Sequence, residues 1–240
     1  MYHSDKKKLP LFLANCCLQT YNQFEHNGDF TIPKGYKKIA SFKAVAFWEE
    51  EWFGFVIESK HNIIIAFRGT DSDPDWIIDA EVSQTPFPFT SENNLVHTGF
   101  LSTYESCRNT ILESLNTISR KKTIYVTGHS LGAALATLCA YDLATNRLNT
   151  YLYTFASPRV GDTLFAKAFN TSVKQSQRYV NVFDIVPLLP PESIYSPTSN
   201  HPWHYQHVLQ EKSFGIQTDT LRGNHSIYTY IKGVAALCKN

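Results

Sequence analysis

The sequence predicts an α/β fold, in which a mostly parallel central sheet carries helices on both faces. Beyond residue 100, apolar strand-like runs alternate with segments of helical spacing, which is the order typical of parallel sheets. The uninterrupted apolar run NIIIAF, at residues 62–67, is typical of a strand that is covered on both sides. A length of 240 residues suits one large domain that buries a sizeable core.

The first part of the chain predicts one helix and three strands. Apolar residues spaced for one helical face predict a helix that ends near Tyr21. Two strands are expected at residues 37–48 and 52–59, with an acidic turn between them at residues 49–51. The run at residues 62–67 then forms the first strand of the parallel part.

The rest of the chain predicts alternating helices and strands. The expected elements are helices at residues 100–120, 133–144, 164–169 and 227–237, and strands at residues 123–128, 150–158 and 178–187. A proline-rich loop and further short strands precede the last helix. Because no repeat, linker or low-complexity tract divides the chain, we expect a single domain over residues 1–240.

Charge and cysteine content exclude several functions. The formal net charge is +1 and both signs are evenly spread, so no polyanion such as nucleic acid is expected as a partner. The five cysteines are odd in number and lack metal-ligand spacing, so we expect mostly buried thiols rather than a disulfide framework. The adjacent Cys16 and Cys17 cannot easily form one bridge.

The N-terminus imitates a secretion signal. Three lysines precede the apolar run LPLFLANCC, and Cys16 stands where a lipoprotein signal would place its cysteine. Pro10 interrupts this short run and Asn15 is a poor residue before a cleavage site, so a first helix is the better interpretation. Without a convincing signal, a cytoplasmic location is expected rather than secretion. No run approaches the length of a membrane span.

The motif GHSLG, at residues 128–132, places Ser130 where a strand-like run gives way to a helix-like run. The two glycines allow the helix to approach the strand closely, and the sharp turn holds the hydroxyl at the carboxyl edge of the sheet. The start of the helix adds a partial positive charge beside the serine. This context favours a nucleophile elbow over the alternative of an ordinary tight turn.

A serine hydroxyl is a weak nucleophile, so it needs a histidine base and a carboxylate that orients the base. Asp184 is the preferred acid, because it lies at the carboxyl end of a predicted strand just before a proline turns the chain away. Asp142 is expected inside a helix and Asp162 at a helix start, where capping explains it. His225 is the preferred base, because it follows a loop and precedes the start of the last helix.

A second group of histidines, His201, His204 and His207, lies in the run HPWHYQH. A zinc site is one interpretation of this run. However, the proline and the strand-like residues that follow would keep the side chains from sharing one face, and no carboxylate or cysteine is spaced to complete a site. We therefore expect structural roles, for His207 in particular, and predict no metal.

These motifs resemble the class 3 lipase family, the α/β-hydrolase group that includes the filamentous-fungal triacylglycerol lipases. The matching segments follow the family's order across most of residues 60–232: IIIAFRGT, WIIDA, VHTGF, VTGHSLGAALATL, FASPRVGD, VNVFDIVPLLPP and HSIYTYI. The resemblance implies an α/β-hydrolase fold and a catalytic triad of Ser130, Asp184 and His225. It also implies an oxyanion hole formed by the Leu131 amide, which elbow geometry predicts as well, and by Thr70.

The same resemblance implies a lid around residues 71–85. Trp76, Ile77 and Ile78 form an apolar group between two aspartates, and a short amphipathic helix of this kind could cover the site in water and open at a lipid surface. The alternative is an ordinary surface helix. The resemblance includes His97, in VHTGF, without assigning it a role.

Together these residues predict a serine hydrolase, a lipase that cleaves carboxylic esters of acylglycerols through an acyl-enzyme. This reaction needs no cofactor, and the expected partners are an acylglycerol or other ester and a lipid–water interface. A phospholipase A1 and a soluble or feruloyl-type carboxylesterase would use the same residues and stay open as alternatives. A noncatalytic lipid-binding protein is more remote, because all three triad residue types are present.

Overall fold

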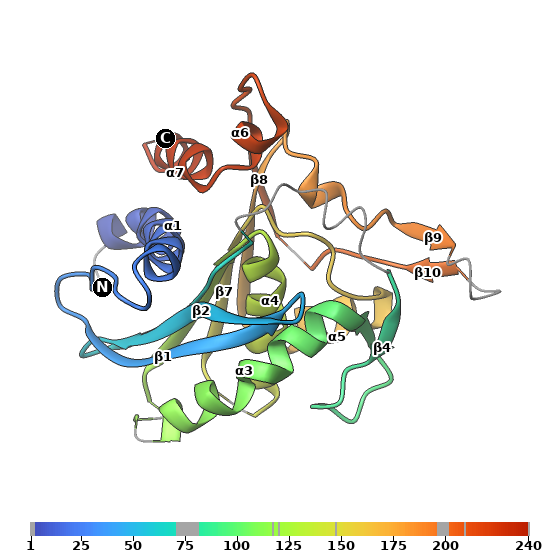
Figure 1. The fold of residues 1–240 in the computed structure, drawn as a ribbon, viewed down its shortest axis with the longest axis horizontal. Helices are drawn as coiled ribbons and strands as arrows, with labels where there is room; N and C mark the ends of the chain where they lie inside the picture. Colours follow the sequence, from blue (N-terminus) through green and yellow to red (C-terminus); the bar gives the residue numbers. More distant parts are fainter. Residues whose placement is uncertain are drawn as a thin grey trace.

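The computed structural model describes residues 3–70, 82–116, 118–119, 121–146, 148–195, 202–208 and 210–239. Its centre is a seven-stranded sheet in the order β1–β2–β3–β6–β7–β8–β11 (Figure 1). The strands of this sheet are β1 (Lys37–Ala46), β2 (Glu49–Glu58), β3 (Asn62–Phe67), β6 (Thr123–His129), β7 (Thr150–Phe155), β8 (Gln175–Asn181) and β11 (Glu211–Phe214). Within this sheet, neighbouring strands pair in parallel from β3 through β6, β7 and β8 to β11, whereas β2 pairs antiparallel with both β1 and β3. The predicted mostly parallel sheet is confirmed.

Helices cover both faces of the sheet, and each face has its own apolar core (Figure 1). Helices α3 (Thr98–Asn116), α4 (Leu131–Thr145) and α5 (Thr163–Ser172) contribute buried side chains to one core. Helices α1 (His3–Glu25) and α7 (Ile227–Leu237) pack together and contribute to the other core. In β3, Ile63 and Ile65 belong to the first core and Ile64 to the second, which explains the uninterrupted apolar sequence of this strand.

Shorter elements complete the described structure. These are the pair β4 (Gln84–Pro86) and β5 (Leu95–His97), the pair β9 (Ser193–Tyr195) and β10 (Pro202–His204), the 3₁₀ helix η1 (Val186–Leu188) and helix α6 (Leu221–His225). Within the described ranges, no helix combines the length and the apolar character that a bilayer crossing requires.

The N-terminal helix α1 is present, and it extends to Glu25, about one turn beyond the predicted end near Tyr21. Its apolar face is the predicted one, since Leu13 and Ala14 are fully buried in the core shared with α7. The prediction of mostly buried thiols is confirmed for four cysteines: Cys16, Cys17, Cys107 and Cys139.

The turn between β1 and β2 differs from the prediction. The sequence predicts an acidic turn at residues 49–51, but Glu49 pairs with Ala46 across the hairpin and the three glutamates belong to β2. Phe47 and Trp48 form the turn instead, with φ angles of 53° and 70°. A two-residue loop matches the twist of its strands when φ is positive at both positions, and this geometry overrides the usual preference for polar turn residues. The conformation costs about 1–3 kcal/mol at each non-glycine residue.

Candidate active site

Ser130 lies in a sharp turn between β6 and α4. Its backbone has φ of 58° and ψ of −128°, which a non-glycine residue adopts only under constraint. A side chain at Gly128 would overlap the Gly132 carbonyl, and a Cβ at Gly132 would come within 2.5 Å of the Phe67 carbonyl oxygen. Both positions therefore require glycine if α4 is to pack directly against β6 and β3. This is the strand–turn–helix geometry of a nucleophile elbow.

The position of the turn is fixed by burial of the helix that follows. Helix α4 is buried from Leu131 to Leu143, and the Ser130 amide donates a hydrogen bond to the Phe155 carbonyl of β7 at 3.0 Å. The first amides of a helix lack acceptors within the helix, and the aligned peptide dipoles place a partial positive charge at this end. The Leu131 amide is the first of these groups, and it lies directly after the serine.

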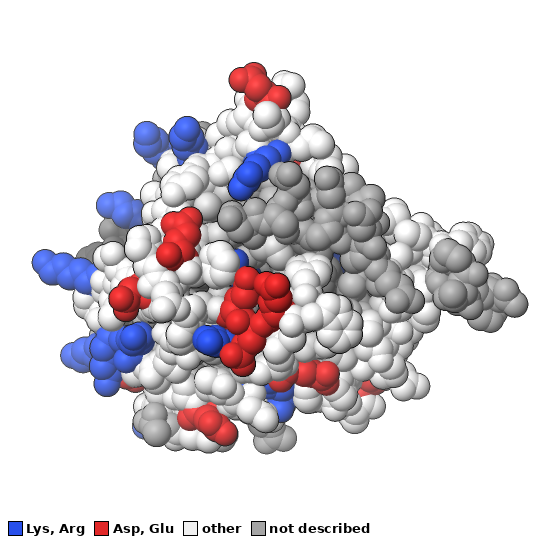
Figure 2. Space-filling model, viewed as in Figure 1, with Lys and Arg blue, Asp and Glu red and all other residues white. Residues whose placement is uncertain are grey.

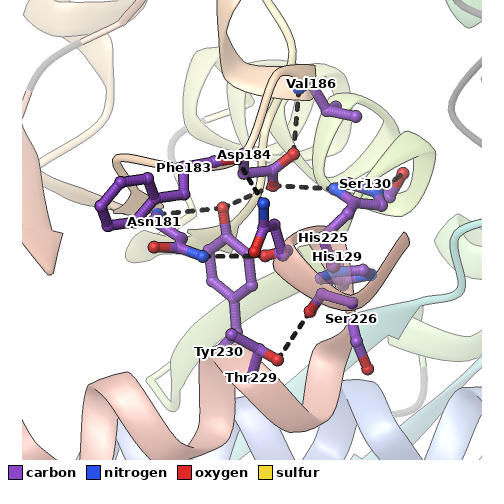
Figure 3. Close-up of polar contacts among 12 residues, drawn as sticks. His129, Ser130, Asn181, Phe183, Asp184, Val186, His225, Ser226, Thr229 and Tyr230 are labelled. Carbon is purple, nitrogen blue, oxygen red and sulfur yellow. Dashed lines mark hydrogen bonds and ion pairs between the residues drawn. The ribbon is translucent and has the colours of Figure 1, made fainter. Parts of the chain in front are cut away.

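Asp184 and His225 meet beyond the carboxyl end of β8 (Figure 3). The Nδ1–H of His225 donates to Oδ2 of Asp184 at 2.8 Å, and the Ser130 hydroxyl donates to Nε2 of His225 at 2.8 Å. The structure thus brings together the three side chains singled out in the sequence. Two local details differ from expectation: β8 ends at Asn181, before the acid, and the base is the last residue of α6 rather than part of a loop.

Burial and hydrogen bonding act in opposite directions on the pKa of Asp184. Burial raises it, whereas the hydrogen bond and charge of His225 lower it, as do the Tyr230 hydroxyl at 2.7 Å and the Val186 amide at 3.0 Å. The net result is a pKa below the ordinary value of an aspartate. An ionised carboxylate in this position orients the imidazole and stabilises the positive charge that develops on it.

Tyr230 and two asparagines connect the segment of the acid to the segment of the base; Figure 3 labels Tyr230 and Asn181. The Tyr230 hydroxyl donates to Asp184 and accepts from the Asn181 amide at 3.1 Å. The side-chain amide of Asn181 donates to the Asn224 carbonyl at 2.9 Å, and that of Asn224 donates to the Phe183 carbonyl at 3.0 Å. Buried amides that bond to both segments fix the spacing between acid and base. The sequence alone does not reveal these three residues, although Asn224 directly precedes the base.

The histidine of the GHSLG motif holds the base from its backbone side. Nε2–H of His129 donates to the His225 carbonyl at 2.8 Å, and Nδ1 accepts from the Tyr21 hydroxyl at 2.7 Å. The proton must lie on Nε2 because a carbonyl oxygen only accepts. Burial, followed by the proximity of His225, lowers the pKa of His129 to about 3. His129 therefore stays neutral and acts as a positioning residue between α1 and the base, a role that the sequence did not reveal.

Thr70 and Leu131, the two predicted oxyanion donors, each line a cavity. A methyl group added at Gly69 would lie 2.9 Å from Cβ of Ser130, so the chain that leads into Thr70 passes next to the serine. Thr70 and His225 line a cavity of about 190 Å³. Leu131 lines another cavity, of about 560 Å³, together with residues of the β1–β2 hairpin and of α3. Both predicted oxyanion donors are thus close to the serine.

Two other histidines have structural contacts. His97 accepts hydrogen bonds from the amides of Gly99 and Phe100 through Nδ1, at 3.1 and 3.4 Å, which caps the start of α3, and burial lowers its pKa to about 4. His207 donates from Nε2 to the Pro187 carbonyl at 2.7 Å, and burial lowers its pKa to about 3. Among the residues that the structure describes, no cluster of three His, Cys, Asp or Glu side chains could hold a metal ion.

The remaining candidates lie outside the triad or outside the described residues. Asp142 is fully buried and paired with Arg108 at 2.6 Å, far along α4 from the serine. Asp162 accepts from the Phe165 amide at 2.7 Å, which confirms the expected cap. His204 lies in β10. The other predicted residues lie outside the described part of the chain: Trp76, Ile77, Ile78 and His201.

Comparison with known proteins identifies the family. The family model described as lipase (class 3) matches residues 64–194, more than half of the chain. The chain belongs to the class 3 lipase family. The match contains the elbow, the strand that leads to Thr70 and the segment of Asp184. The resemblance stated from the sequence motifs is confirmed, and with it the α/β-hydrolase fold.

Individual relatives show how much of the chain is similar to known proteins. The lipase of Rhizomucor miehei is 40% identical in an alignment of 143 positions that covers 56% of this chain and 39% of that protein. Phospholipase A1-II 1 of Oryza sativa subsp. indica is 30% identical in an alignment of 195 positions that covers 67% of this chain and 50% of that protein. The solved structure of the Rhizomucor miehei triacylglyceride lipase is 26% identical, with a TM-score of 0.71, and covers 89% of this chain and 81% of that chain. The chain thus spans between two fifths and half of the two curated relatives.

Proposed function

We propose that this class 3 lipase domain, residues 1–240, is a serine hydrolase that cleaves carboxylic ester bonds of acylglycerols. The supporting observation is the continuous hydrogen-bond chain from Ser130 through His225 to Asp184, with both links at 2.8 Å. The substrate class is supported by the family and by the lipase of Rhizomucor miehei.

The proposed reaction begins with attack of the Ser130 hydroxyl oxygen on the ester carbonyl, while Nε2 of His225 takes the hydroxyl proton. Asp184 stabilises the imidazolium that forms. The oxyanion of the tetrahedral intermediate accepts hydrogen bonds from the Leu131 amide and from Thr70, and one such donor typically contributes about 3–4 kcal/mol. His225 returns the proton to the leaving alcohol. Water then hydrolyses the acyl-enzyme by the same steps in reverse, and no cofactor takes part.

A phospholipase A1 activity is the second candidate, because the rice phospholipase A1-II 1 aligns with 67% of the chain. Both activities need the same triad, so substrate preference distinguishes them. Triacylglycerols of graded chain length and phosphatidylcholine with distinguishable acyl groups would be assayed side by side. Selective release of the sn-1 acyl group from phosphatidylcholine, with little triacylglycerol hydrolysis, would favour the phospholipase.

Substitution of the nucleophile tests the proposal. We expect Ser130→Ala to reduce hydrolysis of p-nitrophenyl butyrate about 10⁴-fold or more, with an unchanged melting temperature. The matched control is Ser157→Ala, since this serine is also buried at the end of a neighbouring strand and its hydroxyl bonds to the Pro158 carbonyl. Normal activity of Ser130→Ala would reject the serine hydrolase mechanism.

A further inference from the structure

The end of the β1–β2 hairpin presents two aromatic side chains to solvent. Trp48 is 98% exposed and Phe47 is 56% exposed, and they are adjacent in the chain. Burial of large aromatic side chains is a major source of folding and binding energy, and Trp48 supplies almost none of this energy to the fold. Here the term hairpin tip means Phe47 and Trp48.

The backbone at the hairpin tip makes this exposure unusual. Both residues have positive φ, in a two-residue loop for which Asn-Gly is the favoured sequence. The chain therefore keeps two strained aromatic residues where small polar ones would give a more stable turn. Local rules of this kind are broken most often at functional sites, so the exposed Trp48 is expected to contact something outside the chain.

The cavities beside the hairpin tip place it next to the proposed chemistry. Phe47 and Trp48 line the cavity of about 560 Å³ that also contains Leu131. Phe47 in addition lines a cavity of about 180 Å³ together with Thr70. Leu131 and Thr70 are the two proposed oxyanion donors. A surface that receives the tip would therefore lie on the side of the molecule that carries these two donors.

The charges next to the hairpin tip indicate which surface it fits. Glu49, Glu50 and Glu51 follow Trp48 directly, and Figure 2 shows an acidic cluster on the face of the molecule that carries the hairpin. Lys43 is paired with Glu50 at 3.4 Å, and Arg68 is paired with Glu51, so among the described residues Glu49 is the glutamate of this cluster whose charge no ion pair balances. An anionic lipid surface would repel this remaining charge. An electroneutral surface carries no such penalty.

We propose that the hairpin tip inserts into the surface of an electroneutral lipid layer and anchors the protein there, with the side that carries Leu131 and Thr70 facing the lipid. This inference rests on the proposed function for its orientation but not for the binding itself. Tryptophan is suited to the role because its large apolar ring and N–H group favour the boundary between acyl chains and water. Shallow insertion of the tip leaves the glutamates in the aqueous layer.

Binding is measured by flotation with phosphatidylcholine vesicles, using the Ser130→Ala protein so that the lipid is not hydrolysed. We expect Trp48→Gly in this background to weaken binding about tenfold or more, since burial of one large aromatic side chain corresponds to at least that factor. Tyr195→Ser is the matched control, because Tyr195 is a 72% exposed aromatic residue at the end of strand β9, outside the β1–β2 hairpin. Trp48→Phe should recover most of the binding. Vesicles that contain phosphatidylglycerol should bind less protein, and Glu49→Gln should remove part of that difference.

A second readout separates anchoring from a structural role. Glycine relieves the strain at position 48, so Trp48→Gly in the otherwise natural chain should leave the melting temperature unchanged or raise it by up to about 4 °C. Hydrolysis of monomeric p-nitrophenyl butyrate should stay within about twofold. Hydrolysis of emulsified triacylglycerol by Trp48→Gly should decrease by about the same factor as its binding to vesicles.

Several results would overturn the inference. These are unchanged vesicle binding by Trp48→Gly, equal loss of binding by Tyr195→Ser, or tighter binding to anionic vesicles. A concentration-dependent dimer that is lost in Trp48→Gly would show that the tip contacts a second copy of the chain instead. If vesicle binding depends on Trp48 while the natural chain hydrolyses no ester, the proposed function fails and the anchor stands.

Discussion

The two sides of the proposed active site are built by different kinds of interaction. On the nucleophile side, Ser130 is held by close backbone packing, because glycines at positions 128 and 132 let α4 press against β6 and β3. On the acid–base side, Asp184 and His225 lie on short connecting segments that are tied together by side-chain hydrogen bonds. The nucleophile side therefore depends on two glycines that have no side chain. The acid–base side depends on polar side chains that folding brings together.

Substitutions on the two sides should therefore have different effects on stability and activity. A steric defect in the elbow disturbs the core between helix and sheet, so it should lower the stability of the whole domain. Loss of one hydrogen bond on the acid–base side should leave the core intact and shift the geometry or pKa of the catalytic groups. Stability and activity measurements can therefore tell the sides apart.

The largest expected effect is loss of the triad itself. His225→Ala should lower kcat/KM for p-nitrophenyl butyrate about 10⁴-fold or more, and the double variant with Ser130→Ala should be no worse than the poorer single variant, because the residues act as one unit. Losses that multiply in the double variant would show that the base and the nucleophile act independently. Circular dichroism would confirm that each variant is folded.

The next effect concerns the steric side. Gly128→Ala should destabilise the domain by about 4 kcal/mol or more in urea unfolding, because its methyl group overlaps the Gly132 backbone. Gly215→Ala is the matched control, since an added Cβ there would meet only Phe183 and Val182 side chains at 3.5 Å. A stable and active Gly128→Ala protein would contradict the role given to close packing.

Three buried histidines should make the domain less stable at low pH. The folded-state pKa is lowered to about 3 for His129 and His207 and to about 4 for His97. In the unfolded chain the pKa of a histidine is about 6.5, so the contribution of these histidines to the free energy of unfolding is complete above that pH. This contribution is lost as the pH falls towards the folded-state pKa values, because the histidines then bind protons in the unfolded chain but not in the folded chain.

Between pH 6.5 and pH 5 the free energy of unfolding should fall by about 2 kcal/mol for each of these histidines. Urea unfolding at several pH values measures the slope. His207→Gln, which keeps a donor for the Pro187 carbonyl, should be less sensitive to acid by about that amount. An identical slope for the variant would show that His207 takes up its proton in the folded state.

The smallest effect concerns a single hydrogen bond to the acid. Tyr230→Phe removes one donor to Asp184, so the pKa of this carboxylate should rise towards its usual value. We expect kcat/KM to fall about tenfold and the acidic limb of its pH profile to move upward, with little change in stability. Tyr228→Phe, at an exposed position in the same helix, is the control. A fall in activity with an unmoved pH profile would assign Tyr230 a packing role only.

The same contrast explains what the sequence could reveal. The elbow, the strand at residues 62–67 and the helix at residues 227–237 are encoded by local patterns, and the structure reproduces them closely. Asp184 and His225 could be singled out because they follow a strand and precede a helix. Their contacts could not be derived, because Tyr230 and the two asparagines meet them only in the folded chain.

The turn of the β1–β2 hairpin was mispredicted for a related reason. Three consecutive glutamates look like a solvent-exposed turn, but the pairing of Ala46 with Glu49 leaves only Phe47 and Trp48 to form it. Register between two strands is set by their whole length and by the twist of the pair, so one polar segment cannot decide it. The exposed aromatic pair that results is the basis of the proposed lipid anchor.

The central proposal is that Ser130 is a nucleophile activated by His225. Intact-protein mass spectrometry after treatment with a fluorophosphonate, followed by peptide mapping, measures this. We predict one adduct per chain, on Ser130, and labelling that is strongly slowed in His225→Ala. An adduct on another residue, or equally fast labelling without the histidine, would contradict it.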